Sequence, residues 1–241
     1  MSGHSHWSSI KHQKAIADAK KGKVFSKLAR VITIAAREKG GDAITNAGLR
    51  LVIEKAKEFN MPKENIERAI KKGTGEIADE KLEEFVFEAF GPGSIAIIIE
   101  GITDNKNRSL GDIKQILTQN NGKLANEGSV KWLFEKKGLI IINSKIQNIK
   151  KEDVELIAID AEAEDIKWKE DNLDIFTKPE NFEAVKKTLE EKGIKIESSA
   201  IEWLAKEEVA TDQKAKEQAE KLFEALDENE AVQNIYSNLK T

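Results

Sequence analysis

The sequence predicts an α+β protein in which an N-terminal three-helix bundle is followed by two α+β domains. Three observations lead to this expectation: helical periodicity before Gly75, alternating and β-branched segments after it, and a length of 241 residues. That length exceeds the ~100 to 150 residues of a typical domain, so more than one apolar core is expected.

The helical bundle is predicted over residues 23–75. Phe25, Leu28 and Ile32 recur at three- and four-residue steps, which is typical of a helix over residues 24–39 with one apolar face. The same helix carries a second stripe, which is basic, and we expect it to present cations on the side away from the apolar face. This stripe consists of Lys23, Lys27, Arg30 and Arg37.

Two further helices are predicted over residues 43–59 and 62–72. Pro62 suits the first turn of a helix, and Gly73 is expected to end the third one. The outer faces of the bundle are expected to carry Arg50, Lys57, Lys63, Arg68, Lys71 and Lys72.

A β-hairpin is predicted after the bundle. Phe85, Phe87 and Ala89 recur at every second position, and a Gly-Pro-Gly turn separates them from a β-branched run over residues 94–100. A helix capped by an Asp or Asn within residues 104–107 is expected to follow, and residues 129–134 have the pattern of a strand.

Residues 139–204 follow the order strand, helix, strand, strand, helix, strand, which is the ferredoxin-like arrangement. Thr177 and Glu180 stand at the spacing of a capping box, so the second of these helices is expected to begin there. Three tryptophans lie on predicted strands and are expected in the core: Trp132, Trp168 and Trp203.

The last helical pattern and the short strand after it, residues 232–236, have no partners nearby in the sequence. The unit after the bundle has three predicted strands but one helix, so adding the last two elements gives four strands and two helices. We therefore predict a discontinuous α+β domain, residues 76–136 plus 207–241, into which the ferredoxin-like domain, residues 137–206, is inserted.

Charge is segregated along the chain. Residues 1–75 contain 16 lysines and arginines against 7 aspartates and glutamates, a net charge of +9, whereas the whole chain carries −4. Such a local excess favours a polyanionic partner, because the field of a patch extends only about 8 Å at physiological salt. A solvated basic helix face is the alternative.

Residues 1–22 are predicted to form a flexible basic arm, and we expect the arm and the first helix to bind nucleic acid. Seven cations within twenty residues repel one another unless phosphates supply the counter-charge. Trp7 stands among them, where it either stacks on an exposed base or anchors the arm to the bundle. The predicted nucleic-acid-binding residues are Trp7, Lys11, Lys14, Lys20, Lys21, Lys23, Lys27 and Arg30.

The sequence contains few residues suited to metal binding or catalysis. His4, His6 and His12 lie in the arm, and the chain has no cysteine, so neither a metal site nor a catalytic triad is expected. We expect no enzyme activity, no cofactor and no small-molecule substrate. Without a signal core or an apolar run near ~20 residues, the protein is expected to be cytoplasmic, with no membrane partner.

Five segments resemble the YebC/PmpR family of probable transcriptional regulators and its mitochondrial relatives, the translational activators of cytochrome oxidase. They are GHSHWSSIKHQKAIADAKKGKVFSKLAR, NAGLRLVIEKAKEFNMPKENIERAIKKGTG, GPGS, TDNKNR and EGSV, and in family order they span essentially the whole chain. Ser94 stands where the family turn often has a second glycine, and Ile16 where alanine is usual. Neither departure alters a charge.

The resemblance implies a YebC-like three-domain architecture around a cleft, and nucleic-acid binding without catalysis. Two functions compete within it: DNA binding at promoters, and binding to the ribosome and its RNA to assist translation of proline-rich stretches. A flexible aromatic and cationic arm suits unstacked RNA. Asn46 and Arg50 on the second helix keep a major-groove DNA mode open.

Overall fold

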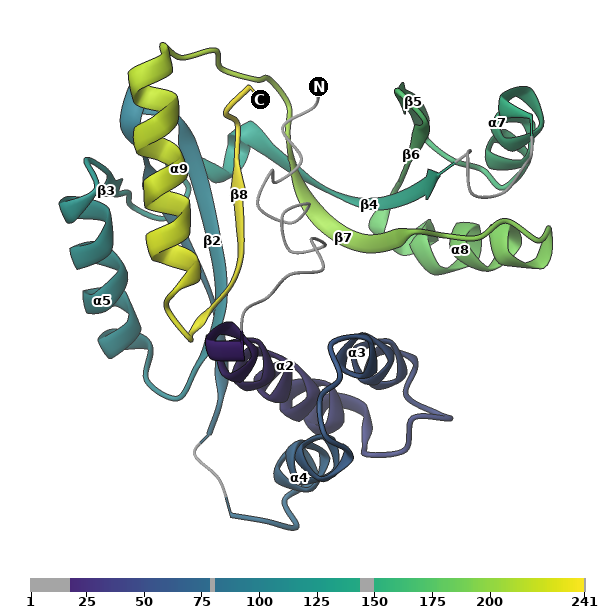
Figure 1. The fold of residues 1–241 in the computed structure, drawn as a ribbon, viewed down its shortest axis with the longest axis horizontal. Helices are drawn as coiled ribbons and strands as arrows, with labels where there is room; N and C mark the ends of the chain where they lie inside the picture. The colour runs from purple at the N-terminus through teal and green to yellow at the C-terminus, as the bar shows by residue number, and fades with distance from the viewer. Residues whose placement is uncertain (1–17, 79–80, 144–149, 241) are drawn as a thin grey trace.

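The computed structural model describes residues 18–78, 81–143 and 150–240, which form a three-helix module and two antiparallel four-stranded sheets with helices (Figure 1). Each of these three units has its own apolar core. The α+β fold class predicted from the sequence is confirmed.

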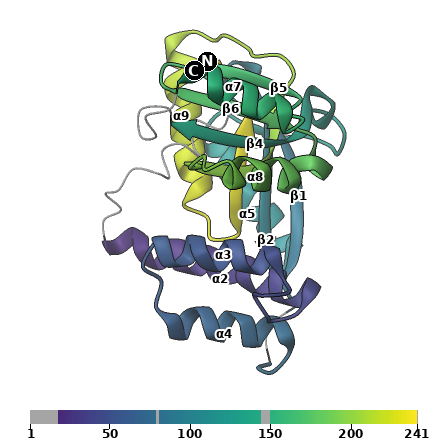
Figure 2. The ribbon, with the colours of Figure 1, turned by 90° about the vertical axis from the view of Figure 1, so that its right-hand side faces the viewer.

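The module consists of helices α2 (Asp18–Lys39), α3 (Ala47–Glu58) and α4 (Lys63–Thr74). Figure 2 shows the three helices below the two sheets. The apolar faces expected from the periodicity meet in its core, because burial of the recurring aliphatic positions is what drives short helices together. The buried core residues are Leu28, Ile32, Ala36, Leu49, Ala56, Met61, Ile66 and Ala69.

Helix α3 begins four residues later than predicted, because Asn46 caps it. The Asn46 side-chain oxygen accepts a hydrogen bond from the Leu49 amide at 3.0 Å, and its amide donates to the carbonyls of Ala35 and Gly40 at 2.8 Å each. Asn46 is 1% exposed. It therefore joins α3 to the end of α2 and has no surface with which to read a base edge.

Gly73 does not end α4 as predicted, since the left-handed cap is Gly75 (φ 81°). Gly73 lies inside the last turn, where a Cβ atom would stand 2.4 Å from the Thr33 carbonyl oxygen of α2. The missing side chain lets the backbones of α2 and α4 approach each other.

The first sheet contains β1 (Glu83–Phe90), β2 (Ala96–Thr103), β3 (Lys123–Leu124) and β8 (Val232–Ser237), in the order β3-β1-β2-β8. Helices α5 (Lys106–Gln119) and α9 (Gln213–Asp227) cover one face. The short turn η1 (Pro92–Ser94) joins β1 to β2, which confirms the predicted hairpin. Strand β8 pairs with β2 although more than 120 residues separate them.

Residues 129–134 do not form the predicted strand. Residues 129–133 form a loop and the 3-10 turn η2 (Lys131–Leu133), Phe134 already begins the first strand of the second sheet, and the third strand before that sheet is β3 instead. The buried carboxylate of Glu88 explains the loop: it accepts backbone hydrogen bonds from Gly128 at 2.6 Å, Val130 at 2.7 Å and Lys131 at 2.9 Å. These amides are thus committed to Glu88 and not to a strand ladder.

The second sheet contains β4 (Phe134–Asn143), β5 (Asp165–Lys169), β6 (Asn172–Thr177) and β7 (Ser198–Ala205), in the order β5-β6-β4-β7. Helices α7 (Lys151–Asp160) and α8 (Phe182–Glu191) pack on one face. The element order along the chain is the ferredoxin-like one that the sequence predicts. The domain boundaries proposed from the sequence stay a prediction.

The predicted capping box before α8 is wrong. A 3-10 turn, η3 (Pro179–Asn181), precedes this helix, and the Thr177 hydroxyl donates to the Lys178 carbonyl at 3.0 Å instead of capping the helix. Pro179 is the first residue of this turn, where its fixed backbone φ angle already suits a helical conformation.

Two smaller apolar clusters join the three units. One, between the sheets, contains Ile98, Phe134, Trp203 and Tyr236; the other, between α2 and the first sheet, contains Ile34, Leu82 and Ile102. Among the described helices, none combines the length and apolar character needed to cross a bilayer.

Candidate nucleic-acid interface

The basic stripe of α2 faces the first sheet, contrary to the expectation that it points outward. The end of α9 and the loop before β8 supply three acidic residues, Asp227, Glu228 and Glu230, and all three pair with this stripe. The stripe positions are four, three and seven residues apart, so they form one row along the helix, and the acidic residues lie along its first three positions.

Lys27 is the most enclosed member of the stripe. Its ammonium group donates to the Asp227 carboxylate at 2.8 Å and to the Asp227 carbonyl at 2.7 Å. The side chains of Lys27 and Asp227 are 10% and 27% exposed. Lys23 pairs with Glu228 at the rim, where both side chains are about half exposed.

The remaining two cations of the stripe hold backbone carbonyls. Arg30 donates to the Ile102 carbonyl at 2.8 Å and lies 3.6 Å from the Glu230 carboxylate, and Arg37 donates to the Leu82 carbonyl at 2.5 Å. Ile102 lies near the end of β2 and Leu82 directly precedes β1, so both arginines attach α2 to the open end of the hairpin, opposite the η1 turn.

The eight predicted nucleic-acid-binding residues therefore have different environments. Trp7, Lys11 and Lys14 lie outside the described residues. Lys20 is in α2, but its side chain is also outside them, and Lys21 is exposed. The others, Lys23, Lys27 and Arg30, have acidic partners within the chain.

The outer faces of α3 and α4 carry the cations that the sequence places there. Arg50 and Lys57 are exposed on α3, and Lys63, Arg68 and Lys71 are exposed on α4, with Lys72 half-buried at its end. Lys63 is paired with Glu67 at 3.4 Å, a contact between exposed side chains that water screens. These residues give the module an accessible basic surface.

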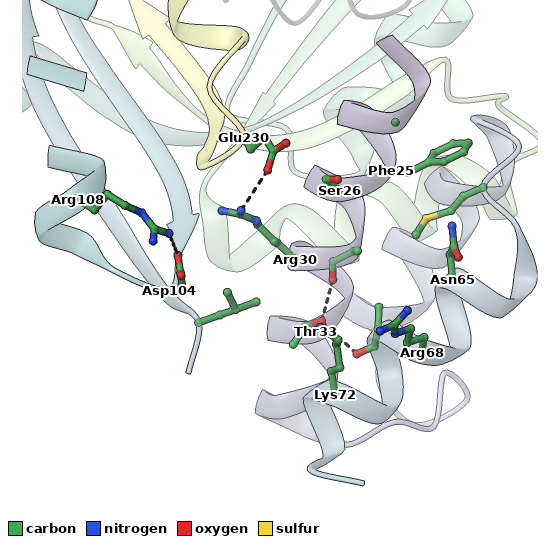
Figure 3. A pocket seen from close by; sticks show the side chains of 15 residues that line it. Phe25, Ser26, Arg30, Thr33, Asn65, Arg68, Lys72, Asp104, Arg108 and Glu230 are labelled. Atoms are coloured by element: carbon green, nitrogen blue, oxygen red, sulfur yellow. Dashed lines mark hydrogen bonds and ion pairs between the residues drawn. The ribbon is translucent and has the colours of Figure 1, made fainter. Parts of the chain in front are cut away.

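A groove of about 520 Å³ opens between α2, α4 and the first sheet (Figure 3). Basic side chains from three elements reach it: Arg30 from α2, Arg68 and Lys72 from α4, and Arg108 from α5. Sequence reasoning missed the groove, because residues more than 80 positions apart form its walls and no local pattern brings them together.

Two of the three tryptophans expected in the core are enclosed and one is not. Trp203 is 8% exposed, and its indole donates to the Glu100 carboxylate at 2.8 Å. Trp168 is half-buried against the second core. Trp132 lies in η2 and is 65% exposed, so the prediction that it is a core residue is wrong. Its position follows from the loop held by Glu88.

The faces of the two sheets that carry no helix contain acidic groups, of which Asp174 is buried and Glu100 and Glu202 are half-buried. Burial is the main reason that the pKa of Glu202, on β7, is raised to about 6. Lys55 of α3 and Lys169 oppose this shift, whereas the neighbouring carboxylates of Asp174 and Glu100 add to it. One carboxylate oxygen of Glu202 has no hydrogen-bond partner among the described residues.

Replacing Glu202 by glutamine is expected to raise the free energy of unfolding at pH 8 by up to about 2 kcal/mol, the equivalent of the shift from 4.5 to about 6. The folded state holds this proton more tightly than the unfolded state, so Glu202 favours folding below pH 4.5, and this contribution is lost as the pH rises through 6. Urea unfolding at pH 5 and pH 8 measures the difference. Glu207→Gln, at an exposed position, is the control and should leave the pH dependence unchanged.

Metal-binding clusters are absent from the described part of the chain, where no group of three or more histidine, aspartate or glutamate side chains could hold an ion. The three histidines fall among residues 1–17, outside it.

The fold defines a class of α+β protein in which an N-terminal three-helix module precedes two antiparallel four-stranded sheets. Ion pairs attach the first helix of the module to the first sheet's domain. Residues 5–76 match a family model described as the TACO1/YebC protein N-terminal domain, and residues 82–239 match one described as the TACO1/YebC second and third domain. The chain belongs to the TACO1/YebC family.

The chain is similar over its full length to proteins named probable transcriptional regulatory proteins. One from Caldanaerobacter subterraneus subsp. tengcongensis is 47% identical over 240 residues, 100% of this chain and 98% of that protein. One from Thermoanaerobacter pseudethanolicus is 46% identical over 240 residues, with 100% and 97% covered. The expectation of a non-enzymatic protein agrees with these names.

The crystal structure of a conserved hypothetical protein from Aquifex aeolicus is also similar. Its TM-score is 0.85 at 41% sequence identity, with 98% of this chain and 97% of that chain covered. The arrangement of module and sheets is therefore shared with a solved structure.

Proposed function

We propose that this protein is a non-enzymatic, nucleic-acid-binding regulator of gene expression that acts in the cytoplasm and binds DNA through its basic N-terminal module. The observation that carries the proposal is the set of exposed cations on α3 and α4, in a chain whose relatives are named probable transcriptional regulatory proteins. Phosphate contacts of this kind supply most of the affinity of a protein for duplex DNA.

The paired stripe of α2 changes which cations we assign to phosphates. The Lys27 side chain is nearly buried and its ammonium group is paired with the Asp227 carboxylate. A phosphate would therefore have to displace that carboxylate before it could bind Lys27. We assign the main contacts to the exposed cations, together with Lys21 and the basic residues 11–20. The exposed set on the module is Arg50, Lys57, Lys63, Arg68 and Lys71.

Ribosomal RNA is the second candidate partner, in which case the protein would assist translation of proline-rich stretches. The burial of Asn46 supports this alternative, because it removes from α3 an amide that a recognition helix could use on a base edge. The sequence of the arm, with Trp7 among lysines, suits unstacked RNA.

Binding to a DNA duplex is expected to weaken with a log–log salt slope of roughly −5 if about six phosphates are neutralised. Fluorescence anisotropy between 50 and 300 mM salt, with a labelled duplex and with a ribosomal RNA helix, measures both slopes. A slope near zero for both would remove the electrostatic proposal. The partner with the tighter binding at 150 mM salt distinguishes the two candidates.

A matched pair of variants tests whether the module supplies these contacts. Lys63→Ala, on α4, should reduce the slope by about one unit. Lys187→Ala on α8 should not change it, although Lys187 is similarly exposed and also has a glutamate four residues later, Glu191 at 3.7 Å. Equal effects of the two changes would place the contacts outside the module.

A further inference from the structure

The groove between α2, α4 and the first sheet is lined by side chains of both helices and of the segments that flank the sheet. At about 520 Å³ it lies within the ~300 to 1,000 Å³ that small-ligand sites occupy. Figure 3 shows side chains from both helices and from the Asp104 and Glu230 loops directed towards it. It has both an apolar wall and a polar wall.

The polar wall carries more positive than negative charge among the described residues. The two acidic groups are already engaged, since Asp104 pairs with Arg108 and Glu230 pairs with Arg30. Helix α4 adds Arg68, whose side chain is exposed. A phosphate group of a ligand would bring counter-charge to this guanidinium.

The apolar wall contains an aromatic ring. Phe25 is half-buried: it packs against the module core and also lines the groove. Asn65 of α4 is exposed beside the groove, and Figure 3 shows Phe25 and Asn65 together at one end of it. An aromatic face next to a side-chain amide and a guanidinium provides stacking, hydrogen bonding and phosphate binding within one site.

We propose that this groove binds one unpaired nucleotide of the nucleic acid held by the module, with the base on Phe25, the base edge at Asn65 and a phosphate at Arg68. The inference rests on the proposed nucleic-acid binding and adds a preference within it. A base inside a duplex has both faces covered by its neighbours, so only a single-stranded or extruded nucleotide fits.

The test compares a single-stranded 12-nucleotide RNA with a duplex of the same sequence, using anisotropy at 150 mM salt. Phe25→Leu keeps an apolar side chain in the core but removes the stacking face. It should lower single-strand affinity about 5- to 100-fold, since stacking on an aromatic ring contributes ~1 to 3 kcal/mol per base. Duplex affinity should change less than twofold.

Substitutions at two exposed positions on α4 are not expected to disturb folding, so they test the groove without a change in stability. Asn65→Ala should lower single-strand affinity and spare the duplex, whereas Lys63→Gln, a change of charge on the same helix outside the groove, should affect both alike. A 5-iodouridine probe in the single strand should photo-crosslink at Phe25, as mapped by mass spectrometry.

The possible results separate this inference from the proposed function. If the wild-type protein binds both nucleic acids but Phe25→Leu and Asn65→Ala change neither preference, or the crosslink maps elsewhere, the groove is not the site and the proposed function stands. If the wild-type protein binds neither nucleic acid, both proposals fail.

Discussion

Replacement of Glu88 by alanine is expected to lower the free energy of unfolding by about 4 kcal/mol, the largest single effect that the structure predicts. The Glu88 carboxylate is 4% exposed and accepts hydrogen bonds from the Gly128, Val130 and Lys131 amides. Hydrogen bonds to a charged group contribute ~1.5 to 3 kcal/mol each, and the change would leave three amides without a partner. Urea denaturation followed by circular dichroism measures the loss.

The pH dependence of this contribution has a definite sign. Burial, the largest influence, raises the pKa of Glu88, but the three backbone hydrogen bonds and the charge of Lys131 together outweigh it and lower the pKa below 4.5. The folded state therefore binds this proton less tightly than the unfolded state. Its stabilisation is present above pH 4.5 and is lost as the pH falls through the lowered value.

Glu84→Ala on the same strand is the control for Glu88, because the Glu84 side chain is exposed. It should change stability by no more than about 0.5 kcal/mol. A loss below 1 kcal/mol for Glu88→Ala would show that the loop at residues 126–131 does not depend on the carboxylate.

Replacement of Lys27 by alanine is the second large effect, with an expected loss of about 3 kcal/mol in the attachment of α2 to the first sheet. Loss of one partner of a buried ion pair costs ~3 to 5 kcal/mol when burial is complete. The Asp227 side chain is 27% exposed, so the lower end of that range applies. Hydrogen exchange of the α2 amides reports the loosened contact.

The rim pair provides the comparison for Lys27. Lys23→Ala should cost less than about 1 kcal/mol, because Lys23 and Glu228 are 42% and 51% exposed and water screens their attraction. If the α2 amides were equally protected from hydrogen exchange in Lys27→Ala and Lys23→Ala, the buried ion pair would contribute no more to stability than the exposed one.

The same ion pair tests whether Lys27 also contacts nucleic acid, as the sequence predicts. Asp227→Asn removes the negative partner while the Asp227 carbonyl, 2.7 Å from the ammonium group, stays in place. If phosphate competes with Asp227 for Lys27, affinity for a duplex should rise in this variant. If Lys27 only attaches the module, affinity should not change.

Local patterns in the sequence were sufficient to locate most elements. The order of elements over residues 139–204 was predicted correctly, and the hairpin of β1 and β2 follows from the pattern of apolar residues around the Gly-Pro-Gly turn. The count of strands in the first sheet was correct for a wrong reason. Residues 129–134 were counted, but the two-residue strand β3 takes their place, and two residues carry too little pattern to detect.

The candidate site was only partly predictable. Helical periodicity identified the basic stripe of α2 and the outer cations of α3 and α4. It could not show that Asp227, Glu228 and Glu230, some 200 residues away, meet that stripe. A row of cations has the same sequence pattern whether phosphate or a carboxylate from the same chain neutralises it.

The sequence alone determined the fold class, the family resemblance and the segregation of charge, since these depend on residue type and on spacing along one element. The tertiary structure decided which cations remain accessible, why Asn46 and Gly73 hold the helices together, and where Phe25, Arg68 and Arg108 form a groove. The physical reason is that accessibility and pairing depend on contacts between distant segments, and only burial of the shared cores brings those segments together.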